Sequence, residues 1–430
     1  MLHHSAQHKR QLRRLIAIFA GLYFVQGTCE PTDGLVSQPL RSMLIDEGAT
    51  PGEVAQFLAL VGLPWLFKPL YGPVVDLVPL FGARRRSWLL VATGLATIGL
   101  GWLSVTSHAM TPGWALGAVL VLPTFAIALG DVATDALMVE TGQPLGVTGA
   151  LQSAQWTASY GATIAIGWLV GWLTELGRGN VAFAIAAVLS GASFLMTFFV
   201  VKEPAPPSDP PEPTSVRGAI KSALAPRVLR AAAFLFLLGF NPFAALEYAH
   251  ITIDLELSDA HYGQAVSVVA IGAVIACLAY GWVAEHFEVK KIAHVSLGSS
   301  VLVTLGLFLI HDEMSDFALS IATSLAWTFA FLLQLDIAAR LCPPRYAATV
   351  FAMLMGVSNG ADSLSAIAGG SLHDWLSPSL GGTGAYDVLV VIGAAATAGA
   401  WAMVPWLARD HALAVKEEED AAGEAPGAPA

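Results

Sequence analysis

Apolar runs of roughly 20 residues, separated by short polar stretches, recur along nearly the whole chain. A helix of roughly 20 apolar residues crosses about 30 Å of hydrocarbon and satisfies its own backbone hydrogen bonds there. The pattern therefore predicts an all-α membrane protein with twelve transmembrane helices. Their predicted bounds are 14–41, 53–78, 87–107, 113–140, 147–174, 181–201, 228–252, 262–286, 290–310, 315–340, 345–376 and 385–408.

The composition favours the same class. The 430 residues are 55% hydrophobic and 12% charged, whereas soluble domains average about 25% charged residues. The three cysteines, Cys29, Cys277 and Cys342, lack the spacing of metal ligands. A Gly-x-x-x-x-Gly-Lys-Ser/Thr loop for nucleotide phosphates is also absent from the sequence. We therefore expect no enzyme activity, no cofactor, no metal and no nucleic-acid partner.

One Pro-rich polar tract, residues 202–216, divides the predicted helices six plus six. Repeated proline prevents a helix and favours an extended, solvated chain. The predicted parts are an N-terminal six-helix bundle (1–201), a cytoplasmic linker (202–227), a C-terminal six-helix bundle (228–409) and an acidic cytoplasmic tail (410–430). The acidic tail contributes to the net charge of -11. We interpret it as a solvated segment and not as a binding site for a partner.

The two predicted bundles repeat one local pattern. Gly72-Pro-Val-Val-Asp76, followed by three arginines, matches Gly281-Trp-Val-Ala-Glu285, followed by two lysines. Both stretches come after the second helix of their bundle. Two parallel halves with this repeat are typical of the major facilitator fold, so we predict two pseudo-symmetric six-helix bundles of that fold.

Lysine and arginine positions predict the orientation in the membrane. Cytoplasmic loops are enriched in these residues, and nearly all of them fall on one side if the N-terminus is inside. Arg41 and Arg178 fall on the outer side, and Lys68 lies within the membrane. We expect cytoplasmic termini, residence in the inner (plasma) membrane of a bacterium, contact with the lipid bilayer, and a monomer.

Four stretches carry a resemblance to a known family. The stretch Pro64–Asp76 with Pro79–Arg86 resembles the signature of the folate-biopterin transporter family of the major facilitator superfamily. Asp131–Glu140, Leu151–Trp156, and the helix 10 to 11 stretch from Ala339 through Asn359 are similar to further motifs of that family. The resemblance covers both halves. It implies a transporter of a folate- or pterin-like solute, although Glu30 and Asp33 make helix 1 more acidic than the family pattern.

Lys68 is a candidate for the transport cycle because a charge at membrane depth is costly and usually functional. Counting helical rise places it at a depth similar to that of Asp131 and Asp135, which lie one turn apart on helix 4. A pair between Lys68 and either aspartate could bind a proton or open to accept a substrate carboxylate. A permanent salt bridge that only joins helices 2 and 4 satisfies the same energetics.

Helices 1 and 7 carry Gly and Pro together, and interrupted segments at matching places in two halves point to a central binding site. Glu30 and Asp33 on helix 1 are three residues apart, as are Glu247 and His250 on helix 7. We predict that these groups, with Asn241 beside the break in helix 7, line the site and that the carboxylates couple protons. The alternative is that they only line a water-filled extracellular vestibule.

Helices 5 and 11 offer a polar and aromatic lining. Gln152 and Trp156 lie on one stripe of helix 5, and helix 11 carries Asn359 and Asp362. Trp156 could stack on a flat heteroaromatic ring such as a pterin, while Gln152 and Asn359 donate or accept hydrogen bonds. Tryptophan in a membrane helix is also common as a packing or interface residue.

A group of charged residues belongs to the cytoplasmic side. Asp76, Arg84, Arg85, Arg86 and Glu140 resemble the gate of the superfamily, in which such groups pair across the two bundles when the cytoplasmic side closes. Three arginines in one loop also hold that loop inside the cell. Both explanations can hold together.

The sequence predicts a secondary active transporter that moves a small molecule by alternating access, with protons as the candidate coupling ion. Two alternatives stay open. One is a permease for a muropeptide or another anionic amphipath. The other is a membrane sensor or assembly factor that keeps the fold and transports nothing.

Overall fold

A computed structural model describes residues 2–106, 114–142, 145, 147–203, 218, 221–222, 224–341 and 347–409. Apart from one isolated bridge between Leu80 and Ala83, the regular elements of these residues are helices. The predicted acidic tail and most of the predicted linker lie outside the described residues. The prediction of an all-α protein is therefore confirmed for the described part of the chain.

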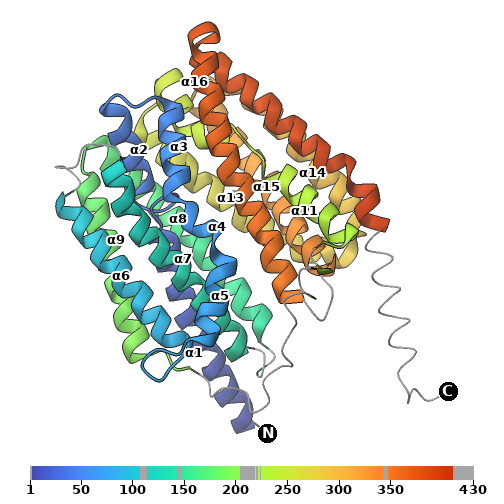
Figure 1. Ribbon diagram of the computed structural model, residues 1–430. Helices are drawn as coiled ribbons and strands as arrows, with labels where there is room; N and C mark the ends of the chain where they lie inside the picture. The colour runs from blue at the N-terminus through green and yellow to red at the C-terminus, as the bar shows by residue number, and fades with distance from the viewer. Residues whose placement is uncertain are drawn as a thin grey trace.

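The N-terminal half forms the left side of the molecule in Figure 1. Its helices are α1 (Leu2–Cys29), α2 (Ser37–Asp46), α3 (Pro51–Val61), α4 (Leu63–Leu66), α5 (Lys68–Leu77), α6 (Arg85–Thr106), α7 (Trp114–Gly142), α8 (Thr148–Glu175) and α9 (Gly179–Phe199).

The C-terminal half forms the right side, and α1 begins and α16 ends toward the same, lower end of the molecule (Figure 1). Its elements are α11 (Pro226–Gly239), the 3₁₀ turn η3 (Ala244–Leu246), α12 (Glu247–Ala249), the π-helical turn η4 (His250–Asp254), α13 (Asp259–His286), α14 (Val289–Gly306), the 3₁₀ turn η5 (Leu307–Leu309), α15 (Glu313–Leu341) and α16 (Ala347–Ala402).

In the described chain, 8 segments are long and apolar enough to cross a membrane. The last of them, Met353–Arg409, runs through α16, which reverses direction at Gly381 (φ 75°, ψ 170°), so two legs descend from one turn at the top of the molecule (Figure 1). Large apolar side chains such as Trp102 and Leu302 are exposed, as suits surfaces in contact with lipid. The count of twelve crossings stays a prediction.

The prediction of one continuous first helix over residues 14–41 was wrong. α1 ends at Cys29, and the chain turns through residues 30–36 before α2 begins. Pro31 has no N–H with which to continue the helix. The Glu30 carboxylate accepts hydrogen bonds from the backbone N–H groups of Thr32 and Asp33, at 2.7 and 2.6 Å. The same local bonds that stop the helix place Glu30 and Asp33 in a turn and not on one helical face.

The second predicted helix, 53–78, is divided into α3, α4 and α5. The divisions fall at Gly62 and Phe67, and a proline follows each of them as the second residue of the next helix, Pro64 in α4 and Pro69 in α5. Proline is tolerated in a first turn but cannot extend the preceding helix. As a result Lys68 is the first residue of α5.

The predicted helix 7 is interrupted too, at a position equivalent to the break after α1. α11 ends at Gly239, and the backbone N–H of Asn241 leaves the helix to donate to Ser365 Oγ at 2.9 Å. Pro242 follows. The chain then continues through η3, α12 and η4. Both interruptions predicted from Gly and Pro are thus present, and both lie where the two halves meet.

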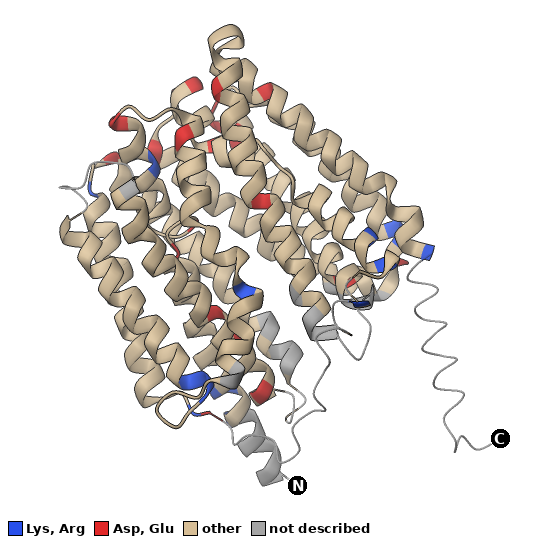
Figure 2. Cartoon of the chain, viewed as in Figure 1, with Lys and Arg blue, Asp and Glu red and all other residues tan. Residues whose placement is uncertain are grey.

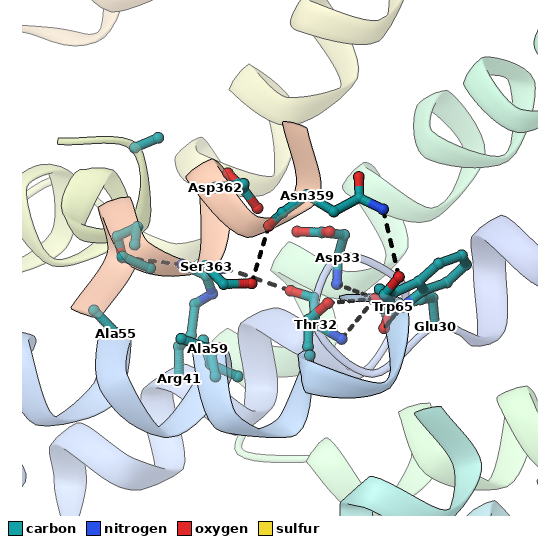
Figure 3. Close-up of a pocket in the computed structure, with 15 residues that line it drawn as sticks. Glu30, Thr32, Asp33, Arg41, Ala55, Ala59, Trp65, Asn359, Asp362 and Ser363 are labelled. Carbon is teal, nitrogen blue, oxygen red and sulfur yellow. Dashed lines mark hydrogen bonds between the residues drawn. The ribbon is translucent and has the colours of Figure 1, made fainter. Parts of the chain in front are cut away.

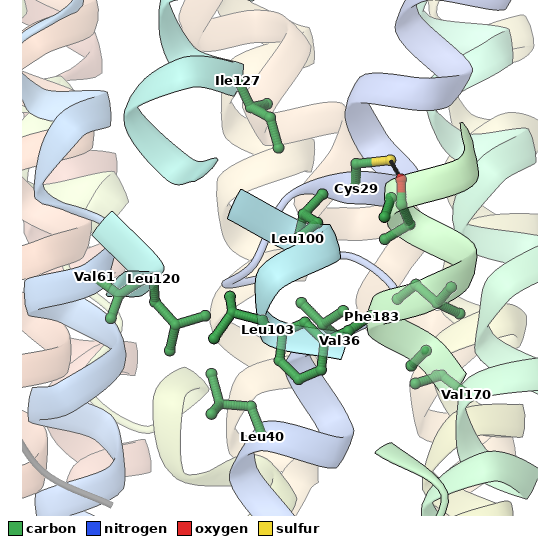
Figure 4. Close-up of a cluster of buried hydrophobic side chains, with 14 of the residues drawn as sticks. Cys29, Val36, Leu40, Val61, Leu100, Leu103, Leu120, Ile127, Val170 and Phe183 are labelled. Atoms are coloured by element: carbon green, nitrogen blue, oxygen red, sulfur yellow. Dashed lines mark hydrogen bonds between the residues drawn. The ribbon is translucent and has the colours of Figure 1, made fainter. Parts of the chain in front are cut away.

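Each half has its own buried apolar core. In the N-terminal half, Leu100 and Leu103 of α6, Leu120 of α7 and Phe183 of α9 pack together, each at most 2% exposed (Figure 4). Cys29 belongs to this cluster, and its Sγ donates a hydrogen bond to the Ala186 carbonyl oxygen at 3.1 Å. Close packing of this kind holds helices together in lipid, where burial of apolar surface gives little driving force between them.

Contacts between the halves gather at the end far from the termini. On α3, Gly52 lies so close to Gly370 of α16 that a Cβ on either residue would overlap the other's carbonyl oxygen. The backbone of α8 meets α13 in the same way at Gly167 and Gly263. Gln38 Nε2 donates to the carbonyl oxygen of Asp259 at 2.7 Å. This end of the molecule is closed by direct backbone contact.

Charged residues are distributed unevenly along the same axis. Lys and Arg gather toward the lower end, where α1 begins, and most Asp and Glu lie toward the closed upper end (Figure 2). Since basic residues favour the cytoplasmic side, the distribution agrees with the predicted orientation of the lower end.

Candidate functional site

A cavity of about 410 Å³ lies between the two halves, beneath the closed end. It is lined by the turn after α1, by α3 and α4 from one half, and by η3 and α16 from the other (Figure 3). Four predicted site residues meet here, namely Glu30, Asp33, Asn359 and Asp362.

Glu30 is fixed by its neighbours and is only 6% exposed. Besides the two backbone N–H groups described above, its Oε2 accepts from the Thr32 hydroxyl at 2.7 Å. Its Oε1 accepts from the indole Nε1 of Trp65 at 3.1 Å. A buried carboxylate with several donors is held in one orientation.

Asp33 and Asp362 differ from Glu30. Their carboxylates point into the cavity beside Asn359 (Figure 3), and among the described residues neither has a hydrogen-bond or ion-pair partner. Asp33 comes from the turn after α1, and Asp362 from α16, so the two negative charges act on each other across the boundary between the halves. Like charges held at close range repel.

Arg41 of α2 supplies the guanidinium of this cavity. It donates through Nη1 to the Ala245 carbonyl oxygen at 3.3 Å and through Nη2 to that of Thr32 at 3.4 Å. The bond to Ala245 joins the two halves, and the bond to Thr32 lies within the N-terminal half. Sequence reasoning had assigned Arg41 only to an outer loop, because α2 was counted as part of the first helix.

Trp65 connects the cavity with a buried charge pair. Its indole N–H faces Glu30, while Lys68 Nζ lies over its ring, 4.8 Å from the ring centroid. Asn359 Nδ2 donates to the Trp65 carbonyl oxygen at 3.4 Å. The Trp65 side chain therefore touches an acid and a cation, and its backbone carbonyl contacts a residue of the opposite half.

Lys68 forms a salt bridge with Asp131 of α7. The side chains are 27% and 13% exposed, so the pair is only partly shielded. Asp135, one turn farther along α7, accepts from the Tyr23 hydroxyl of α1 and from Gln155 Nε2 of α8, the latter at 3.4 Å. The predicted geometry is present, and Tyr23 is a partner that sequence reasoning missed.

A second cavity, of about 400 Å³, is lined mainly by the C-terminal half, with Tyr160 of α8 from the other half. Asn241 and Glu247 line it together with Asp316 of α15. Asp316 pairs with His261 of α13, whose Nε2 lies 2.6 Å from Oδ2, and both side chains are at most 3% exposed. These two residues were missed because they stand at the predicted ends of helices 8 and 10, where a charge needs no special explanation.

His250 does not face the same way as Glu247. Its ring stacks on Tyr386 of α16 with centroids 4.0 Å apart, and its Nδ1 lies 3.0 Å from Oδ2 of Asp254. His250 thus packs against α16 and is not among the residues that line either large cavity.

Trp156 of α8 packs against other aromatic rings. Its ring centroid lies 5.5 Å from that of Phe331 in α15 and 5.9 Å from that of Tyr160. Phe331 and Tyr160 line the second cavity, so Trp156 stands behind that lining. The side chain of Gln152 lies outside the described residues.

The charged residues at the lower end contact one another within the N-terminal half. Glu140 Oε1 accepts from Arg85 at 2.8 Å and from Arg84 at 3.5 Å, while Arg86 donates to the Thr197 carbonyl oxygen at 3.2 Å. The Glu203 carboxylate accepts from the backbone N–H groups of all three arginines at 3.1–3.2 Å, where α6 begins. The Asp76 side chain lies outside the described residues.

Comparison with known proteins gives a match to the BT1 family over residues 31–426. The chain is 30% identical to a folate-biopterin transporter of Synechocystis sp., over 84% of this chain and 75% of that protein. It is 22% identical to the probable folate-biopterin transporter 4 of Arabidopsis thaliana, over 84% of this chain and 88% of that protein.

Solved structures give the fold. A mutant of the nucleoside transporter NupG matches with a TM-score of 0.74 at 15% identity, over 91% of this chain and 99% of that chain. A D-xylose-proton symporter matches with a TM-score of 0.66 at 12% identity, over 91% and 97%. The described chain thus shares the fold of major facilitator transporters.

Proposed function

Because the chain belongs to the BT1 family, we propose that it is a secondary transporter that moves a folate- or pterin-like solute across a membrane by alternating access. In this proposal the chain crosses the membrane twelve times, with Met353–Arg409 supplying two crossings. The basic lower end and both termini face the cytoplasm of a bacterium, and the protein works as a monomer in its inner membrane.

The single observation that carries the proposal is the position of the 410 Å³ cavity. It is built from both halves, and ligand pockets generally have volumes of about 300–1,000 Å³. A flat heteroaromatic solute would find the Trp65 ring on one side and polar groups from Asn359 and Ser363 on the other. Because each half contributes to the lining, movement of one half against the other changes the access to the cavity.

The closed outer end indicates which state of the cycle this conformation represents. Gly52 and Gly370 are in backbone contact there, so the outer route into the cavity is shut. In the other state these contacts would separate and the lower ends would meet. Arg84, Arg85 and Glu140, with Arg86 and Asp76, would then exchange their partners within one half for partners across the boundary.

Glu247 is the candidate site for proton coupling. It lies in the second cavity with Asp316, and the positive charge of Arg41 from the opposite half acts on it. Opening of the outer end would withdraw Arg41, since its hydrogen bond to Ala245 joins the halves. Withdrawal of a cation makes a carboxylate easier to protonate. Protonation of Glu247 would therefore be favoured on the outer side and opposed when that side closes.

Transport by the purified protein in lipid vesicles tests the proposal. Uptake of labelled folate, biopterin and a muropeptide is measured with an imposed pH gradient of either polarity, and vesicles without protein serve as the control. We expect accumulation of a folate- or pterin-like solute that an inward proton gradient increases. Accumulation of the muropeptide alone would support the alternative permease, and no movement of any solute under either polarity would contradict transport.

A further inference from the structure

The 410 Å³ cavity carries an excess of negative charge. Its lining contains three carboxylates, from Glu30, Asp33 and Asp362, and one guanidinium, from Arg41. Arg41 already donates to two carbonyl oxygens and acts on Glu247 of the second cavity. Its single positive charge cannot balance three carboxylates, so acidic groups remain in excess in this lining.

The three carboxylates have different roles. Glu30 accepts four hydrogen bonds from its own turn and from Trp65, and it is almost fully buried. Asp33 and Asp362 accept none from the described residues, and both side chains are exposed to the cavity. Glu30 thus maintains the shape of the turn, and the other two carboxylates are left for a ligand.

Asp33 and Asp362 belong to opposite halves, so the repulsion between their charges acts on the distance between the halves. When the cavity is empty, repulsion between them opposes the approach of the halves. A ligand that donates to both would replace the repulsion with two attractions. Binding would then favour the state in which the halves meet above the solute.

The groups around the two carboxylates are mainly acceptors. Asn359 uses one of its two Nδ2 protons for the Trp65 carbonyl oxygen, and Ser363 donates its hydroxyl proton to the backbone carbonyl oxygen of Asn359 at 3.1 Å. Ionised carboxylates only accept hydrogen bonds. A solute with adjacent N–H donors fits between the two carboxylates, whereas a solute carboxylate placed there would face like charges.

We propose that this cavity recognises the amino-heterocycle end of its solute. That end is a neutral or cationic ring whose adjacent N–H donors bind to Asp33 and Asp362. The glutamate end of a folate is not recognised there. This inference rests on the proposed function for its choice of pteridine probes. In chemical terms, carboxylates from both halves accept hydrogen bonds from an exocyclic amine and from the neighbouring ring N–H.

Equilibrium binding separates this inference from transport. Labelled pterin (2-amino-4-oxopteridine) is bound to the purified full-length protein, and two unlabelled competitors are compared. The first, pteridine-2,4-dione, keeps the ring and replaces the amine with an oxygen. The second, 4-aminobenzoyl-L-glutamate, carries the other end of a folate. We expect the dione to compete at least tenfold more weakly than pterin, and the glutamate compound to compete more weakly still.

Asp33→Asn and Asp362→Asn keep the size of each side chain and remove its charge. We expect each to weaken pterin binding by about tenfold to a hundredfold, the range for a lost hydrogen bond to a charged group. The difference between pterin and the dione should shrink by a similar factor. Glu47→Gln, on an exposed acid at the end of α2, is the matched control and should leave both unchanged.

The outcomes are distinct. Equal competition by pterin and the dione, stronger competition by 4-aminobenzoyl-L-glutamate, or no pterin binding at all would overturn the inference. So would Asn variants that alter the dependence on pH or Na⁺ and leave the ratio of pterin to dione unchanged, because the carboxylates would then hold the coupling ion. Selective pterin binding without any uptake would retain the inference and remove the transport proposal.

Discussion

The Asp374 carboxylate on α16 accepts a hydrogen bond from the backbone N–H of Gly52, the second residue of α3, at 3.1 Å. The same carboxylate accepts from the hydroxyl of Thr50, which caps α3. A residue of the C-terminal half therefore sits on the positive end of a helix in the N-terminal half. This contact belongs to the closed outer end, so the outer end cannot open without breaking it.

Asp374→Ala should shift the protein toward an outward-open state. Loss of hydrogen bonds to a charged group costs about 1.5–3 kcal/mol, or about tenfold or more in the ratio of the two states. The measurement is the rate at which a membrane-impermeant maleimide labels Ser363→Cys in a background without Cys29, Cys277 and Cys342. A faster rate from the outside is expected. An unchanged rate would mean that the glycine contacts alone hold the end closed.

Lys68→Ala should abolish transport while the protein still inserts into the membrane. The change leaves Asp131 unpaired, and breaking a buried pair from one side typically costs about 3–5 kcal/mol; exposure of this pair reduces that figure. The test is Lys68→Ala combined with Asp131→Asn, which removes both charges. If the pair serves the transport cycle, the double variant regains thermal stability but not uptake. Restored uptake would instead assign the bridge a purely structural role.

Glu247→Gln should separate coupling from solute movement. The amide imitates a protonated carboxyl at every pH, so a coupled proton could no longer be released. We expect uptake driven by a pH gradient to be lost, while exchange of labelled for unlabelled solute continues. Glu256→Gln, on an exposed acid of the same segment, is the control. Gradient-driven uptake that persists in Glu247→Gln would remove Glu247 as the proton site.

Trp65→Phe removes the donor to Glu30 and keeps an aromatic ring near Lys68. Loss of a donor to a buried acceptor costs about 1–3 kcal/mol, and we expect the ratio kcat/KM for uptake to fall by about tenfold. Trp65→Leu removes both interactions and should reduce it further. Equal losses in the two variants would mean that only the hydrogen bond matters and that the contact between ring and ammonium has no part.

Asp312, outside the membrane segments, predicts a pH dependence of stability. The backbone N–H of Ser315 donates to its Oδ1 at 2.8 Å, which lowers the pKa of the Asp312 carboxyl. A carboxyl with a lowered folded pKa stabilises the fold above its unfolded pKa, and this is lost as pH falls through the folded pKa. Asp312→Ala should therefore lower Tm in detergent at pH 7 more than at a pH below about 4.

Asp312→Asn provides the comparison for this measurement. The amide keeps an acceptor for Ser315 but cannot titrate, so its difference from the native protein should also narrow in acid. Its Tm at pH 7 should lie between those of the native protein and Asp312→Ala. A difference between native protein and Asp312→Ala that is independent of pH would show that the charge does not contribute.

The sequence predicted those features that depend on regular helical geometry. Lys68 and Asp131 could be placed at one depth because the rise per residue in a helix is constant. The breaks near Gly27 and Gly239 could be predicted because proline and glycine act locally. The folate-biopterin resemblance was confirmed by the family match over residues 31–426.

Other features depend on where the chain leaves the helix and on what packs beside it. Glu30 and Asp33 would share a face only if α1 continued, but Glu30 itself binds the next N–H groups and ends that regularity. Trp65 reaches both Glu30 and Lys68 only because α4 is a separate short helix. The pairing of His261 with Asp316 depends on the packing of α13 against α15, which no local pattern records.

The glycine contact between α8 and α13 has a mechanical consequence. Gly167, Gly171 and Gly263 bring two backbones together close to the outer end of α8, and the Ser267 hydroxyl donates across this contact to the Ile164 carbonyl oxygen at 3.1 Å. From Gly171 to the inner end of α8 the helix extends about 35 Å at 1.5 Å per residue. If this contact is the fulcrum, each degree of rotation displaces the far end of α8 by about 0.6 Å over that lever arm. The lower ends of the two halves can then separate widely while the fulcrum scarcely moves.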